Sequence, residues 1–183
     1  QALMQVHRGI PEHADTAAVL TIGNFDGVHL GHQALLSLLT RVSHAQHVVE
    51  IGTGAGVSGL WLLAGMPPSG ILTTIDPETE HHRAARQAFG DAGIAPSRTR
   101  LITGAPTDVL TRLADDSYDV VFVDGSLLNY PVFVAEAVRI LRPGGVVVLN
   151  NASADGTIAD REATDPRTLA AREAAQLIAD DDR

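Results

Sequence analysis

The sequence has no cysteine among its 183 residues. A disulfide framework, a thiolate nucleophile and a cysteine-based zinc site are therefore excluded. Aromatic residues make up only 4% of the chain, so the hydrophobic core has to be built mainly from Val, Leu, Ile and Ala. Such a core suits a parallel sheet that is covered by helices on both faces.

The sequence also lacks an apolar run of transmembrane length, and no signal-peptide pattern stands at its start. Its formal net charge of −9 disfavours nucleic acid and anionic membrane surfaces as partners, because both attract basic proteins. We expect a cytoplasmic protein that binds a small-molecule ligand, with no nucleic-acid and no membrane partner.

Strand-like and helix-like segments alternate along the chain, which is typical of repeated β-α units. Strands are predicted at 19–22, 47–51, 71–75, 100–103, 118–123 and 146–149, and helices at 32–42, 58–64, 78–92, 107–113, 131–141 and 168–178. The crossover rule makes these strands parallel. We expect one α/β domain over residues 1–183, a Rossmann-like three-layer sandwich with a largely parallel sheet of about six strands and helices on both faces.

A glycine-rich turn joins the strand at 47–51 to the next helix. Gly52, Gly54 and Gly56 alternate with other residues there, and glycine lets a backbone turn sharply and approach a ligand closely. Glu50 stands in the apolar end of the strand, where a buried carboxylate is costly unless it binds something. Asp76 ends the following strand, the usual place for a carboxylate that holds ribose hydroxyls. A nucleotide-cofactor site is predicted; a tight turn without a ligand is the alternative.

Four motifs, at 49–56, 72–76, 118–124 and 141–145, combine into a specific pattern. Residues from about 36 to 183 resemble a bacterial class I S-adenosylmethionine-dependent O-methyltransferase of the catechol O-methyltransferase-like group. The resemblance implies S-adenosylmethionine or S-adenosylhomocysteine as the cofactor, and a dimer is one possibility because members of the group often dimerise. The cofactor-binding residues it implies are Glu50, Gly52, Thr53, Gly54, Gly56, Ser58, Asp76, Gly104, Ala105 and Asp124. Glu50, Gly52 and Gly54 would contact the methionine end, Asp76 the ribose, and Gly104 and Ala105 the adenine.

The same group usually binds a divalent metal beside the cofactor, through an Asp after the fourth strand and an Asp-Asn pair after the fifth. The matching positions are Asp124, Asn150 and Asn151, so one carboxylate is replaced by an amide. Hard cations favour charged oxygen ligands, and we expect a degraded metal site. Leu127 replaces the lysine near the reacting hydroxyl and cannot act as a base. Asp124 is left as the candidate catalytic residue, and metal-independent transfer by positioning stays an alternative.

The segment Val19–His32 carries a different signature, with His29 and His32 in a histidine-x-glycine-histidine motif. Residues from about 3 to 36 resemble the N-terminus of bacterial FAD synthetase, the riboflavin kinase/FMN adenylyltransferase. The later motifs of that family are missing, so we interpret the two histidines as vestigial. The domain would then consist of a nucleotidyltransferase-like segment, 1–36, and a methyltransferase-like core, 37–183. Our hypothesis is an engineered chimera joined near Ala34–Leu36.

The fifth methyltransferase strand, 146–149, would lie at an exposed edge, because the two further strands of the group are not found after it. An exposed edge is an aggregation liability, and we predict that strand 19–22 covers it. The remaining histidines, including His81 and His82, are expected to be solvated. Three functions stay open: an S-adenosylmethionine-binding methyltransferase-like domain with weak or no activity, a designed scaffold without catalytic function, and an adenylyltransferase using His29 and His32.

Overall fold

The computed structural model describes residues 18–22 and 30–181, and in them strands and helices alternate. The strands are β1 (Ala18–Ile22), β2 (His47–Ile51), β3 (Ile71–Asp76), β4 (Thr99–Thr103), β5 (Tyr118–Val123) and β6 (Leu141–Asn150). The α-helices are α1 (Leu30–Val42), α2 (Val57–Gly65), α3 (Thr79–Asp91), α4 (Pro106–Leu110), α5 (Tyr130–Ile140) and α6 (Pro166–Ala179). Short 3-10 turns are η1 (Pro96–Arg98), η2 (Leu127–Asn129) and η3 (Thr157–Ala159).

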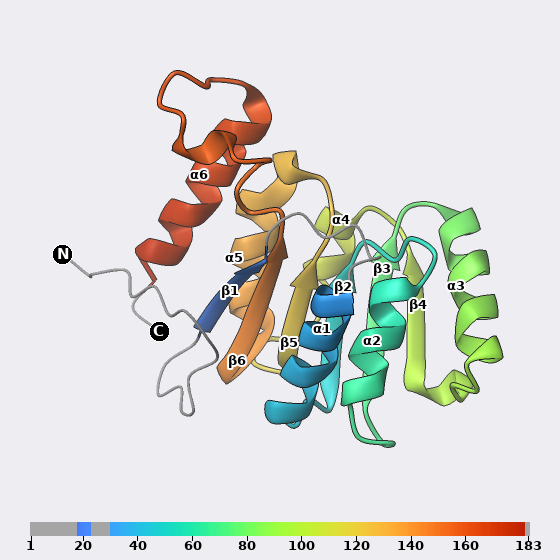
Figure 1. Ribbon diagram of the computed structural model, residues 1–183. Coiled ribbons are helices and arrows are strands. Elements are labelled where there is room, and N and C mark those ends of the chain that lie inside the picture. The colour runs from blue at the N-terminus through green and yellow to red at the C-terminus, as the bar shows by residue number, and fades with distance from the viewer. Residues whose placement is uncertain (1–17, 23–29, 182–183) are drawn as a thin grey trace.

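The strands form one sheet in the order β1-β6-β5-β2-β3-β4, and every pair in it is parallel (Figure 1). Five of them, β2 to β6, form the Rossmann-like core, and β1 is added at its edge. The predicted α/β class and parallel sheet are confirmed. Strand β5 is apolar from Val120 to Val123 and these residues are fully buried, as both faces of a covered parallel sheet require.

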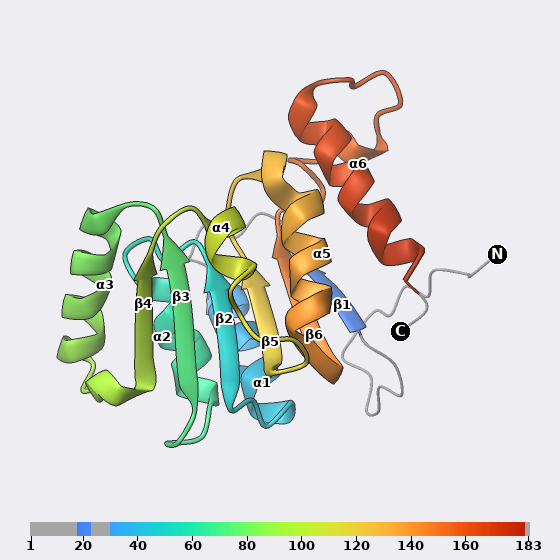
Figure 2. The same ribbon diagram turned by 180° about the vertical axis from the view of Figure 1, so that it is seen from behind.

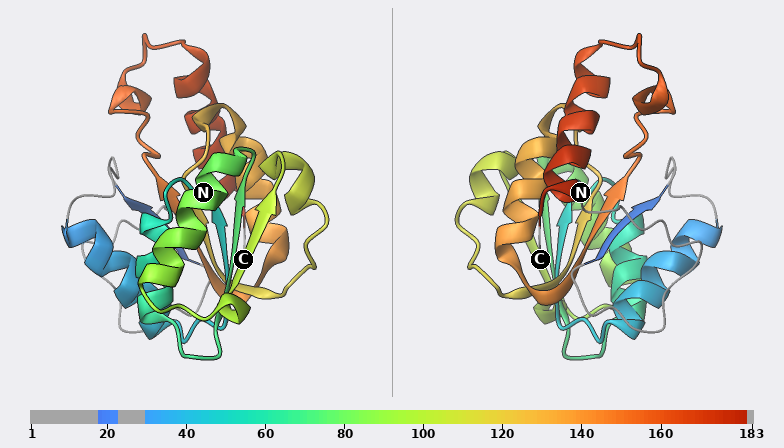
Figure 3. Two further views of the ribbon diagram at one scale, coloured as in Figure 1. Left: turned by 90° about the vertical axis from the view of Figure 1, so that its right-hand side faces the viewer. Right: turned by 90° about the vertical axis from the view of Figure 1, so that its left-hand side faces the viewer.

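Helices cover both faces of the sheet. One hydrophobic cluster packs α1, α2 and α3 against it and includes Leu36, Leu62 and Phe89. The other packs α4, α5 and α6 against the opposite face and includes Leu110 and Phe133. Figure 2 shows α4 and α5 in front of the sheet, and Figure 3 shows the layers from the two edges. None of the helices in the described residues is long and apolar enough to span a membrane.

Strand β1 lies beside β6, where the sequence analysis placed it. The register runs from Ala18 opposite Val146 to Ile22 opposite Asn150. With β1 in place, the β6 residues Val147, Val148 and Leu149 are buried. The predicted covering of this edge is confirmed.

The predicted start of the last strand is wrong. A strand was predicted only from 146 to 149, but β6 already begins at Leu141 and includes residues 143–145. The register against β5 jumps from Leu141 opposite Tyr118 to Val146 opposite Val120, which is a bulge. Gly144 has a φ of 77° there, a left-handed conformation that glycine adopts without strain.

Candidate functional site

The loop between β2 and α2 is built from glycines with left-handed backbone conformations. Gly52, Gly54 and Gly56 have φ values of 100°, 48° and 86°. A Cβ on Gly52 would lie 2.4 Å from the carbonyl oxygen of Asp124, and one on Gly56 would lie 3.0 Å from Ala85. The loop is therefore pressed against the end of β5 and against α3. A Cβ on Gly54 would meet no atom within 4 Å, so the open side of the loop is at Gly54.

Asp76, at the end of β3, is joined directly to this loop. Its carboxylate accepts hydrogen bonds from the backbone N–H groups of Thr53 at 3.0 Å and Gly54 at 3.2 Å. It also accepts the N–H of Glu78 at 2.9 Å and lies 3.0 Å from Nδ1 of His81. Burial alone would raise the pKa of Asp76, but these hydrogen bonds outweigh it and lower the pKa. The glycine loop and this carboxylate thus form one unit.

Glu50 lies beneath the same loop and is completely buried. Its Oε1 accepts a hydrogen bond from the hydroxyl of Ser58 at 2.5 Å. Among the described residues, no group donates a hydrogen bond to its Oε2. Burial raises the pKa of Glu50 to about 7, and the Ser58 hydrogen bond offsets only part of that effect. A buried, unpaired carboxylate oxygen is costly and marks a place where a ligand group could bind.

His82 supports the loop from behind, and the expectation that it is solvated is wrong. Its side chain is 1% exposed. Its Nε2 lies 3.1 Å from Oγ1 of Thr53, and its Nδ1 lies 2.9 Å from Oγ1 of Thr103. Burial lowers its pKa. The sequence does contain a signal, since His82 shares a helix face with the buried Ala85 and Phe89 at spacings of i+3 and i+7.

Gly104 and Ala105 lie at the carboxyl end of β4, next to Asp76. The N–H of Gly104 donates a hydrogen bond to the backbone carbonyl of Asp76 at 3.1 Å, and Ala105 precedes the first turn of α4. The carboxyl ends of β2, β3 and β4 are thereby brought together, which is where ligands bind in open α/β sheets.

A pocket of about 360 Å³ lies at the carboxyl ends of β5 and β6, beside the loop. It is lined by Asp124, Gly125, Ser126, Leu127, Tyr130, Asn150, Asn151 and Arg167. The side-chain amide of Asn150 donates a hydrogen bond to Oδ1 of Asp124 at 2.6 Å. Desolvation raises the pKa of Asp124, and this hydrogen bond offsets part of the rise. The Tyr130 hydroxyl donates a hydrogen bond to the backbone carbonyl of Asn150.

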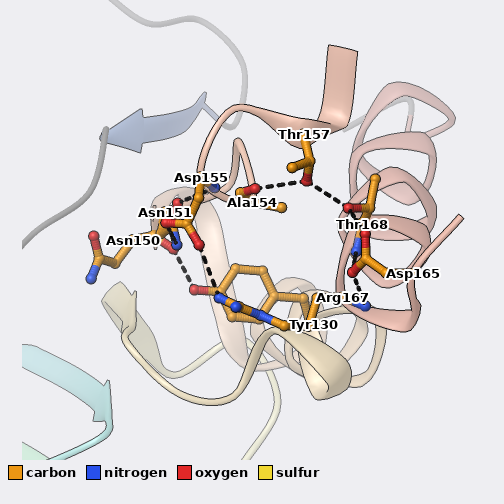
Figure 4. A network of polar contacts seen from close by, with 9 residues as sticks. All are labelled: Tyr130, Asn150, Asn151, Ala154, Asp155, Thr157, Asp165, Arg167 and Thr168. Atoms are coloured by element: carbon orange, nitrogen blue, oxygen red, sulfur yellow. Dashed lines mark hydrogen bonds and ion pairs between the residues drawn. The ribbon is translucent and has the colours of Figure 1, made fainter. Parts of the chain in front are cut away.

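The expected metal ligands do not come together as a set. Asn151 directs its amide to Asp155 instead, with Nδ2 and Oδ1 each 2.9 Å from their partners there (Figure 4). Within the described part of the chain, no group of three His, Cys, Asp or Glu side chains could hold a metal ion. One carboxylate that already accepts an amide N–H does not fit Mg²⁺ or Ca²⁺, which prefer several charged oxygens.

Leu127 and the two motif histidines were also predicted to bear on function. Leu127 is 6% exposed and packs into the core, so it contributes no reactive group. Of the two motif histidines, His29 lies outside the described residues, and His32 falls within α1 at a position whose side chain is not described. The structure therefore does not test a role for either histidine.

A glycine loop after the first core strand, followed by an acidic residue at the end of the next, is typical of Rossmann-like proteins. The protein-family model described as O-methyltransferase matches residues 14–183. The chain belongs to this O-methyltransferase family.

Individual relatives agree with this assignment. A protein of Mycobacterium sp. (strain JLS) named "Putative O-methyltransferase" is 60% identical over 150 residues, which is 82% of this chain and 68% of the relative. A solved structure from Corynebacterium glutamicum is 39% identical with a TM-score of 0.79, covering 84% of this chain and 73% of that one. An O-methyltransferase from Bacillus cereus, solved in complex with SAH, is 29% identical with a TM-score of 0.80, covering 85% and 72%.

These comparisons give no support to an FAD synthetase component, to a chimera or to a lack of activity. The residues matched by the family model begin at 14 and so include the segment Val19–His32 on which the chimera hypothesis depended.

Proposed function

We propose that the protein binds S-adenosylmethionine at the glycine loop and transfers its methyl group to a hydroxyl of a small molecule in the adjoining pocket. The observation that carries the proposal is the unit formed by the loop and Asp76, with the unpaired Oε2 of Glu50 beneath it. The Bacillus cereus relative in complex with SAH supports the same cofactor class.

The residues present fit this cofactor. Gly54 leaves the open side of the loop free of side-chain atoms. Asp76 would accept the ribose hydroxyls, and Gly104 and Ala105 would border the adenine. The unpaired oxygen of Glu50 would take the methionine ammonium, a cation that favours the charged form of a carboxylate whose pKa is about 7. Gly52, Thr53, Gly56 and Ser58 would hold the loop in its shape.

When bound, S-adenosylmethionine supplies a methyl group activated by a positive sulfur. Asp124 is the candidate base. Its Oδ1 accepts the Asn150 amide, and its second carboxylate oxygen would accept the proton of an acceptor hydroxyl. The raised pKa of Asp124 brings it closer to the range in which a carboxylate exchanges protons. Asn150 and Tyr130 position it, and no step depends on a metal.

The proposal is tested by titrating the protein with S-adenosylhomocysteine in a calorimeter, with ATP as the control ligand. We expect saturable binding of S-adenosylhomocysteine alone. The matched variant Asp76→Asn keeps the size of the side chain and removes its charge, and we expect it to weaken binding by about tenfold or more. A cooperatively folded wild-type protein that does not bind S-adenosylhomocysteine would overturn the proposal, and binding of ATP alone would favour adenylyl transfer.

The single sheet and the two hydrophobic clusters on its faces support the proposal that the chain folds as one domain. A single unfolding transition, with the same midpoint by circular dichroism and by fluorescence, would be its signature. Two separate transitions would contradict it.

A further inference from the structure

The pocket beside Asp124 contains a positive charge that the proposed methyl transfer does not use. Of the described residues that line the pocket, Arg167 is the one with a positively charged side chain. The chain has no lysine, and its formal net charge is −9. A guanidinium that lines a pocket of such an acidic protein therefore differs sharply from its surroundings and is a candidate anion-binding group.

Arg167 does not stabilise the helix to which it belongs. It follows Pro166 in the first turn of α6, and a cation at a helix N-terminus is disfavoured by the helix dipole. The N–H groups of this turn are already capped, because Asp165 accepts hydrogen bonds from the N–H groups of Arg167 and Thr168 at 3.1 Å. The backbone N–H groups of the helix end are therefore not the anion-binding groups. The candidate anion-binding group is the side chain of Arg167.

A chain of contacts holds Arg167 at the pocket. Its guanidinium is 3.2 Å from a carboxylate oxygen of Asp155, and Asp155 is held in turn by Asn151 (Figure 4). Asn151, Ala154 and Asp155 have φ values of 53°, 50° and 58°, left-handed conformations that are unfavourable for residues with a Cβ. A strained turn of this kind is maintained by its surroundings and is common at ligand sites.

The ion pair with Asp155 leaves Arg167 available to a ligand. The two side chains are 57% and 48% exposed, and exposed pairs of this kind contribute little stability. The contact uses one nitrogen of a group that has five N–H donors. A carboxylate entering the pocket can therefore form a second, bidentate pair with Arg167 without breaking the first contact.

We infer that the pocket selects a methyl acceptor that carries a carboxylate, which binds Arg167 while the acceptor hydroxyl faces Asp124. This inference rests on the proposed function. Asp124 repels the carboxylate of such a molecule and Arg167 attracts it. The two charges therefore orient the acceptor so that its hydroxyl, and not its carboxylate, lies next to the cofactor. A volume of about 360 Å³ is at the small end of ligand pockets and suits a single-ring hydroxy acid.

The test compares two acceptors that differ only in charge, 3,4-dihydroxybenzoate and its carboxamide. Both are titrated into protein saturated with S-adenosylhomocysteine. We expect the wild-type protein to bind the acid about tenfold or more tightly than the amide. Arg167→Gln removes that preference by weakening the acid alone, whereas Arg167→Lys keeps part of it. Arg161→Gln, at an exposed arginine in the segment that precedes α6, is the matched control and leaves the preference unchanged.

Asp155→Asn separates ligand binding from a structural role. It frees the guanidinium of its protein partner, so we expect it to keep or increase the affinity for the acid. If Arg167 served only to hold the turn, Asp155→Asn and Arg167→Gln would lower the melting temperature alike and leave the acid-to-amide ratio unchanged, which would overturn the inference. Equal binding of acid and amide, or binding of neither by the saturated protein, would also overturn it. Failure to bind S-adenosylhomocysteine at all would instead be a failure of the proposed function.

Discussion

The side-chain amide of Asn150 donates a hydrogen bond to Asp124 across 2.6 Å, at the place where the related metal-binding pattern has two acidic groups. An amide donor stabilises the carboxylate without adding a second negative charge. The pocket is therefore organised around one carboxylate that can exchange a proton, and a divalent cation finds too few charged oxygens there.

Metal chemistry at this position can be tested by restoring the missing charge. We expect Asn150→Asp to create a binding site for Ca²⁺ or Mg²⁺ next to Asp124, so that millimolar metal raises its melting temperature by several degrees. The wild-type protein should show no such rise, and a chelator should leave its affinity for S-adenosylhomocysteine unchanged. An equal thermal shift in the wild-type protein would show that an acidic pair is not needed.

Glu50 gives the free energy of unfolding a characteristic pH dependence. Its pKa is raised from 4.5 to about 7 in the folded protein, so between these values the folded state holds a proton that the unfolded state has lost. Stability must then fall as pH rises through this window, by a contribution on the order of 3 kcal/mol. Glu50→Gln cannot titrate and should flatten this decline in urea unfolding measured from pH 5 to pH 8. Parallel curves for the two proteins would refute the assignment.

The same carboxylate should link cofactor binding to pH. If the methionine ammonium pairs with charged Glu50, the affinity for S-adenosylhomocysteine rises as pH increases through about 7. Glu50→Gln should bind more weakly and lose this dependence. Titrations at pH 6 and pH 8 decide the point, and a wild-type affinity that does not change with pH would exclude the pairing.

His82 and its neighbour His81 form a natural pair for comparison. His82→Ala leaves a cavity and removes hydrogen bonds to Thr53 and Thr103, so we expect a loss of about 2–4 kcal/mol. His81→Ala removes a half-exposed side chain and should cost far less. Because burial lowers the pKa of His82, stability that depends on its neutral form is lost as pH falls below about 6.5. Chemical denaturation at pH 7.5 and pH 5.5 measures both effects, and similar losses for the two variants would be inconsistent with the buried position of His82.

Gly52 and Gly54 separate the folding role of the loop from its binding role. Gly52→Ala forces a Cβ to 2.4 Å from the carbonyl oxygen of Asp124 and should destabilise the fold by at least about 3 kcal/mol. Gly54→Ala meets no protein atom and costs about 1–2 kcal/mol of backbone strain, but its Cβ stands on the open side of the loop. We expect this variant to fold and to lose affinity for S-adenosylhomocysteine. Undiminished binding by Gly54→Ala would place the ligand elsewhere.

The positions of the strands and of the cofactor loop could be predicted because the signals for them are local. Apolar runs such as 118–123 indicate strands. The spacing of the glycines and the carboxylates Glu50 and Asp76 indicate where strands end and where the cofactor loop lies. The family resemblance left the edge at 146–149 uncovered, and a right-handed crossover lets strand 19–22 reach it, which is why the position of β1 beside β6 could be predicted. The bulge at 143–145 could not be foreseen, because a Pro-Gly-Gly run indicates a turn and gives no information about pairing with β5.

Side-chain partners could not be predicted in the same way. Sequence places Asn151 at the end of β6, but it does not say that Asp155 will compete for its amide. His82 stands among charged residues on α3 and is buried because its two ring nitrogens form hydrogen bonds with the hydroxyls of Thr53 and Thr103. Arg167 lies in a segment without a motif, and it reaches the pocket only because the turn after β6 carries α6 back toward it. These contacts depend on tertiary geometry, which spacing along the chain does not encode.

The pairing of β1 with β6 also determines when the sheet can be completed. Ala18 in β1 pairs with Val146 in β6. During synthesis β1 is made first among the described strands, and it can pair only after β6, the last of them, has been made. Closing so long a segment of chain slows folding, because its entropy is lost before the contacts form. Until then the β6 side of the sheet stays unprotected, and a β1 segment from a neighbouring copy could occupy it. Synthesis of this protein therefore passes through an interval in which exchange of β1 between chains competes with folding.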